Sequence, residues 1–97
     1  MKHLRLVYIM SIMLTKVLAA EGDLSSPSNV NTATVVRLYN SHTAAIVITR
    51  KNSGGTTIGS FSAVNGEVIF VEKDPTDTLT AASQGNKQLV AKVAYGN

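Results

Sequence analysis

The sequence contains no cysteine and no tryptophan, and only two of its 97 residues are histidine. The absence of cysteine excludes a disulfide scaffold, a thiolate zinc site, a cysteine nucleophile and an iron–sulfur cluster. Because His3 and His42 are the only imidazoles, a metal centre built from histidines is not expected either. The sequence therefore predicts no metal and no cofactor.

Charged side chains are also few, at 15% of the sequence against about 25% in an average soluble protein. The net charge of +3 arises in the first 20 residues, which hold Lys2, Arg5 and Lys16 and no acidic residue. From residue 21 onward, six basic residues are balanced by six acidic ones. The folded part has no basic excess of the kind that binds a phosphate backbone, so no nucleic-acid partner is expected.

Three interpretations of residues 1–20 stay open. As a secretory signal, they offer a basic start, an apolar stretch and a cleavage site after Ala19 or Ala20. As an over-called start, they precede a true initiation at Met13, and the protein then opens with a short strand. As a docking arm, they are retained and bind a partner. The apolar stretch reaches only 15 residues and contains Lys16, against about 20 residues for a transmembrane helix, so no membrane association is expected in the mature form.

The segment 21–31 is rich in Ser, Pro and Asn and is predicted to be a linker. The domain proper is then expected over 32–97. Within it, six segments rich in Val, Ile, Thr and aromatic residues predict strands, and none has the 3.6-residue period of a helix. They are Thr34–Tyr39, Ala44–Lys51, Thr56–Ala63, Glu67–Lys73, Thr78–Ala82 and Gln88–Tyr95.

Turn sequences separate these segments. Asn65-Gly66 is the strongest, since both residues tolerate the positive φ of a type I′ hairpin turn, and Asn52–Gly55 predicts a second hairpin. Strands that recur about every ten residues leave no room for crossover helices. The expected fold is all-β: a small antiparallel β-sandwich or barrel of about six to seven short strands with an extended N-terminal arm.

Two segments are apolar at consecutive positions instead of alternate ones: residues 44–48 and the run Val68, Ile69, Phe70 and Val71. Such runs suit a central strand covered on both faces, or a strand whose second face binds another chain. A domain of this size with no disulfide has a thin core, so burial against copies of itself or other proteins is expected. The run from Val68 to Val71 is the candidate interface, and a homo-oligomer is predicted.

Two further side-chain patterns carry expectations. In the last segment, Leu89, Ala91, Val93 and Tyr95 share one face, while Lys92 marks the other face as solvent-facing. Arg50 and Lys51 follow an apolar run directly and have the position of charged residues that keep an open strand edge from aggregating.

No arrangement of residues predicts catalysis. His42 lies in an expected turn beside Ser41, without the third group that orients a nucleophile and base. Glu72, Asp74 and Asp77 are acidic and close in sequence, but they lack the spacing and the glycine of a calcium loop. Asp74 and Asp77 are instead expected to accept backbone hydrogen bonds in a turn. The protein is therefore expected not to be an enzyme.

A family resemblance supplies a function. The stretch from Asn31 onward contains a strand with the sequence VRLYN (36–40), a hairpin ending in TRK (49–51), a GSF strand (59–61) and an apolar strand leading into KDPTD (73–77). In these features it resembles small all-β virion proteins of tailed bacteriophages of marine bacteria, over about two thirds of the chain. The family carries no catalytic motif.

The resemblance implies a structural role in the phage particle. The expected role is a capsid decoration or cement protein, or a neck or tail accessory subunit, with other virion proteins or copies of itself as partners. The location would then be the virion. The alternative is a secreted or periplasmic β-sandwich binding module, released when a signal peptide is cleaved.

Overall fold

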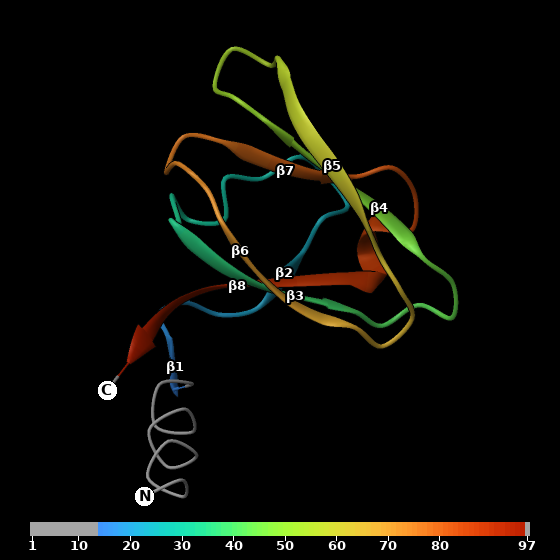
Figure 1. Ribbon diagram of the computed structural model, residues 1–97, viewed down its shortest axis with the longest axis horizontal. Helices are drawn as coiled ribbons and strands as arrows, with labels where there is room; N and C mark the ends of the chain where they lie inside the picture. The colour runs from blue at the N-terminus through green and yellow to red at the C-terminus, as the bar shows by residue number, and fades with distance from the viewer. Residues whose placement is uncertain (1–13, 97) are drawn as a thin grey trace, which may run out of the picture.

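The computed structural model describes residues 14–96, which form a β-sandwich of two antiparallel sheets (Figure 1). The predicted all-β fold is confirmed. Between residues 14 and 96 the one helical element is a short 3-10 turn, η1 (Gly85–Lys87). In Figure 1 the two layers face each other, with β4, β5 and β7 above β3, β6 and β8.

The larger sheet has five strands in the order β1-β8-β3-β6, and β2 also pairs with β8. Its strands are β1 (Leu14–Val17), β2 (Gly22–Asp23), β3 (Val35–Asn40), β6 (Val68–Glu72) and β8 (Gln88–Gly96). The smaller sheet has the order β5-β4-β7, from β4 (Ile46–Lys51), β5 (Thr57–Ala63) and β7 (Thr78–Ala81). The six predicted strands all form, each within two residues of its expected ends.

The two expected hairpin turns have different outcomes. Asn52–Gly55 does join the paired strands β4 and β5, and Asn52 N–H donates to Thr56 O at 2.9 Å. Asn65-Gly66 is a turn, but the prediction of a hairpin there is wrong, because β5 and β6 belong to different sheets. Gly66 has φ 77° and its N–H donates to Asn40 O at 2.9 Å, which directs the chain across to β3.

The core lies between the two sheets and consists of aliphatic side chains from both. Within residues 14–96 the fully buried members include Val36 and Leu38 from β3, and Ile46 and Ile48 from β4. They occupy alternate positions of their strands, which is the period-two pattern of a sheet with one face inward. The remaining buried members are Leu24, Val30, Ala33, Ala63, Leu79 and Val90.

The segment 21–31, expected to be a linker, is packed against the domain. Leu24 and Val30 are buried in the core, and Ser28 forms an antiparallel bridge with Leu79 of β7. Leu24 N–H donates to Gly85 O at 3.0 Å. The segment therefore packs against the sandwich, although its composition, rich in Ser, Pro and Asn, had predicted a linker.

The end of that segment turns left-handed. Val30, Asn31 and Thr32 have φ values of 55°, 57° and 55°, a conformation that costs an L-residue roughly 1–2 kcal/mol. Ala33 N–H donates to both Asn29 O and Val30 O, which closes the turn. The turn places Val30 and Ala33 in the core at the start of β3.

Strand β8 differs from the expected one-sided pattern. The face that carries Lys92 also carries Gln88 and Val90, both fully buried between the sheets, so the prediction that this face meets solvent is wrong. On the opposite face Ala91 and Val93 are buried but Tyr95 is exposed. The reason is that this face of β8 is turned toward the core, of which Val90 is a member.

Candidate functional site

The run from Val68 to Val71 forms β6, which is an edge strand of the five-stranded sheet. The first of the two interpretations of this run, a central strand covered on both faces, is therefore wrong. Ile69 and Val71 point inward and pack against the core. Val68 and Phe70 point outward and are 43% and 37% exposed. The structure thus separates the two faces of this strand.

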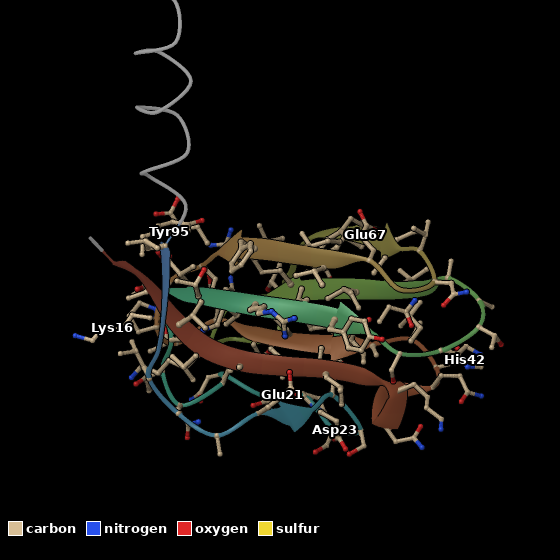
Figure 2. All side chains as sticks on the ribbon, turned by 90° about the horizontal axis from the view of Figure 1, so that it is seen from below. Lys16, Glu21, Asp23, His42, Glu67 and Tyr95 are labelled. Carbon is tan, nitrogen blue, oxygen red and sulfur yellow. The ribbon has the colours of Figure 1, made fainter. Side chains whose placement is uncertain are left out.

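Phe70 is joined on this outer face by Tyr95 of β8. Their ring centroids are 6.2 Å apart with an interplanar angle of 47°, a tilted contact within the range of favourable aromatic pairs. Tyr95 is 62% exposed. We call Val68, Phe70 and Tyr95 the aromatic patch. In Figure 2 Tyr95 lies at the end of the sandwich where the chain enters, away from His42 and Glu67.

An ion pair lies on the same outer face. Arg37 of β3 stands in register between Phe70 and Ala91, and its Nη1 is 3.3 Å from Oε2 of Glu21. Glu21 precedes β2, so the pair fixes the N-terminal segment over the sheet. Both side chains are more than one third exposed, and such a pair contributes about 0–1 kcal/mol. It gives the aromatic patch a polar border.

A buried group of charges lies at the turn between β6 and β7. Asp77 accepts hydrogen bonds from Nε of Arg50 at 2.8 Å and from the N–H of Asp74 at 3.1 Å. The hydrogen bonds from Arg50 hold the pKa of Asp77 below its ordinary value, against an opposing effect of burial. The expectation that Asp77 accepts a backbone hydrogen bond here is confirmed. Arg50 was expected to guard an open edge, but β4 is the central strand of its sheet.

Lys73 is the least expected member of this group, since it is only 3% exposed. Its Nζ donates to Ala33 O at 2.7 Å and to Asp74 O at 3.1 Å. Burial lowers the pKa of Lys73, while the carboxylate of Asp77 acts in the opposite direction. The ammonium group thus ties the left-handed turn to the β6–β7 turn. No sequence signal distinguished this lysine from a solvent-exposed one.

Two buried carboxamides lie at the other end of β3. Asn40 donates to Ala44 O at 3.0 Å and to Ala63 O at 2.8 Å, and its Oδ1 accepts from the N–H of His42. These contacts join the two sheets. Gln88 is its neighbour in register, and its side chain is fully buried without a hydrogen-bond partner in the described residues.

The side chains considered for chemistry do not assemble into a catalytic or metal site. Ser41 Oγ donates to Lys87 O at 2.7 Å, which directs the hydroxyl to a backbone carbonyl. Over residues 14–96 no group of three or more His, Asp or Glu side chains is placed to hold a metal ion, and no pocket is present. In the same part of the chain no helix is long and apolar enough to cross a membrane.

Comparison of the chain with protein-family models, with curated proteins and with solved structures found no match. The aromatic patch on the outer face of β6 is therefore the candidate functional site on geometric grounds. Its three side chains are large and apolar or aromatic, and they are exposed although such side chains are usually buried.

Proposed function

We propose that the protein is a non-enzymatic structural subunit of a tailed-phage particle, either a capsid decoration protein or a neck or tail accessory. It acts through contacts with other virion proteins or with copies of itself. The observation that supports this proposal is the aromatic patch, in which Phe70 and Tyr95 contact each other while both remain substantially exposed.

The aromatic patch has the composition of an interface centre. Exposed aromatic side chains are enriched at protein–protein interfaces, where they lose water on docking with little loss of conformational entropy. The Arg37–Glu21 pair supplies a polar rim on one side. A further exposed apolar side chain lies on β1, where Val17, 70% exposed and paired with Val93, shares the face of the sheet that carries Tyr95.

The pairing of β1 bears on the alternative of a secreted or periplasmic binding module. Leu14 to Val17 pair in register with Gly96 to Val93, and Leu18 N–H donates to Lys92 O at 3.0 Å. Cleavage after Ala19 or Ala20 would remove this strand and leave residues 93–96 of β8 without a partner on that edge. The pairing of β1 with β8 supports the virion proposal, in which residues 14–17 stay in the mature protein.

The location is tested by mass spectrometry of purified particles. Tailed particles are banded from a lysate of the host that carries the gene, and the tryptic peptide 52–73 is sought in the particle band and in the periplasmic and culture fractions. We expect the peptide to co-purify with the particles. Recovery only from the periplasm or medium, as a chain beginning after Ala19 or Ala20, would support the secreted module instead.

The aromatic patch is tested by substitution. Phe70→Asp places a charge at an outward position, so the protein should fold but fail to join the particle. Val64→Asp is the matched control, because Val64 is also exposed, at 56%, but lies in the turn outside the aromatic patch. Equal incorporation of the two variants would contradict the role of the patch. Circular dichroism of both purified variants verifies that they are folded.

A further inference from the structure

Strand β5 is an edge strand without the usual protection of an edge. At the other edge of its sheet, β7 is covered by Ser28, whose N–H and C=O both bond to Leu79. In the described residues β5 pairs with β4 alone. The stretch from Asn52 to Gly66 contains no charged residue and no proline. Natural edge strands carry lysines or prolines because an open row of N–H and C=O groups recruits another strand.

The free backbone groups of this edge can be identified from the ladder. Ala82 N–H donates to Val47 O, so the polar groups of Val47 point toward the β7 side. Those of Ile46 and Ile48 then point toward β5, where their partners are Ala63 and Phe61. By the same alternation, Ser60 and Ser62 direct their N–H and C=O groups outward. The ladder shifts register at Arg50/Lys51, beyond this stretch.

The strand is complementary to itself about Ser60. If a second copy pairs antiparallel with Ser60 opposite Ser60, the outward N–H and C=O groups of the two serines bond to each other. Gly59 of one copy then lies opposite Phe61 of the other, as a non-hydrogen-bonded pair in which side chains come closest. A Cβ built on Gly59 meets no atom within 4 Å, so there is open space for the aromatic ring. A ring lying over a strand glycine is a known means of stabilising such a site.

We propose that a second copy of this chain binds β5 through this antiparallel register, so that two three-stranded sheets join into one continuous sheet across a two-fold axis at Ser60. The absence of charged residues from the stretch 52–66 supports a second copy as the occupant, because a charged side chain near a two-fold axis would be repelled by the same side chain of the other copy. This contact is separate from the aromatic patch and holds whether or not the protein belongs to a particle.

The first test measures the mass in solution by analytical ultracentrifugation of the full chain. We expect twice the monomer mass of 10.3 kDa for the native protein. Ser60→Lys places like charges opposite each other and should raise the dimer dissociation constant at least about tenfold, without unfolding the monomer, because Ser60 is exposed. Ser53→Lys adds the same charge in the β4–β5 loop and should leave the dimer intact. A monomeric native protein, or a dimer that survives Ser60→Lys, would overturn the proposal.

The second test determines the register. The chain has no cysteine, so Ser60→Cys introduces a single thiol at the expected two-fold axis, where opposed Cα atoms lie about 5.5 Å apart, within disulfide reach. Mild oxidation should give a disulfide-linked dimer, and Ser53→Cys should not. A dimer that is dissociated by Phe70→Asp, but not by Ser60→Lys, would place the contact on the aromatic patch and overturn pairing through β5. Loss of particle incorporation without loss of the β5 dimer would affect only the proposed function.

Discussion

Asp77 accepts hydrogen bonds from both Nε and Nη2 of Arg50, at 2.8 and 2.5 Å, although 27 residues separate the two in the chain. The contact joins the centre of the smaller sheet to the turn that leads from β6 into β7. Asp77 is 3% exposed while the side chain of Arg50 is 32% exposed, so the pair is half-buried, and removing Arg50 would leave a buried carboxylate without its partner.

The first prediction concerns the acid stability that this pair provides. The folded-state pKa of Asp77 lies below its ordinary value of 3.8, so the stabilisation is complete above pH 3.8 and is lost as the pH falls through the lower, folded-state value. Asp77→Asn should lower the Tm clearly at pH 7, and the difference from the native protein should shrink below pH 3.8. Thermal unfolding followed by circular dichroism measures both. Asp74→Asn is the control, since that carboxylate is 80% exposed and should change little.

The second prediction concerns the buried ammonium group of Lys73. Burial lowers its folded-state pKa below the ordinary 10.5, so in the window below pH 10.5 the unfolded chain binds more protons than the folded one. Stability from this group therefore rises with pH there. Compared with Lys73→Met, the native protein should gain stability as the pH rises toward 10.5 in urea unfolding. Lys87→Met, at an exposed position, is the control, and an equal gain relative to that variant would contradict the prediction.

Much of the fold could be predicted because strands and turns are local. Six segments of Val, Ile and Thr, bounded by Gly, Asn and Asp, became β3 to β8 within two residues at each end. What followed Asn65-Gly66 could not be predicted in this way. A turn sequence indicates that the chain reverses, but the sheet that the next strand joins depends on contacts with distant residues such as Asn40.

The same reason limits what the sequence says about the candidate sites. Val68 to Val71 was identified as unusual because it is apolar on both faces, but only the topology shows that Phe70 points outward beside Tyr95. The hydrogen bonds from Arg50 to Asp77 and from Lys73 to Ala33 join residues that lie 27 and 40 positions apart in the chain, so no local pattern predicts them. That β5 is an edge strand among the described residues likewise follows only from the strand order.

The third prediction tests whether residues 22–31 belong to the domain. Leu24 is 1% exposed in the core, so Leu24→Ala should lower the free energy of unfolding by about 2–5 kcal/mol. Leu18 is 46% exposed, and Leu18→Ala should cost well under that. Chemical denaturation of both variants gives the two values. Equal and small losses of unfolding free energy in the two variants would contradict the burial of Leu24 in the core.

The fourth prediction concerns the contact between that segment and η1. A Cβ at Gly85 would lie 2.2 Å from the backbone oxygen of Leu24, and backbone atoms cannot move aside without displacing β2. Gly85→Ala should therefore destabilise the fold by about 1–3 kcal/mol, as overpacking does. Gly22→Ala is the control, because its Cβ would meet no atom within 4 Å. Similar denaturation midpoints for the two variants would contradict the close approach.

The last prediction concerns the left-handed turn. Thr32 has φ 55°, is exposed, and pays the steric cost of a β-branched residue in this conformation, whereas glycine adopts it freely. Thr32→Gly removes that strain but loosens the unfolded chain, so we expect a net stabilisation of about 0.5–1 kcal/mol. Thr57→Gly, in an exposed strand position with no positive φ, should destabilise by about 0.5–1 kcal/mol for the same entropic reason. Urea unfolding measures the change in stability of both variants. A gain for Thr32→Gly and a loss for Thr57→Gly would support backbone strain at Thr32. A loss of stability in both variants would contradict it.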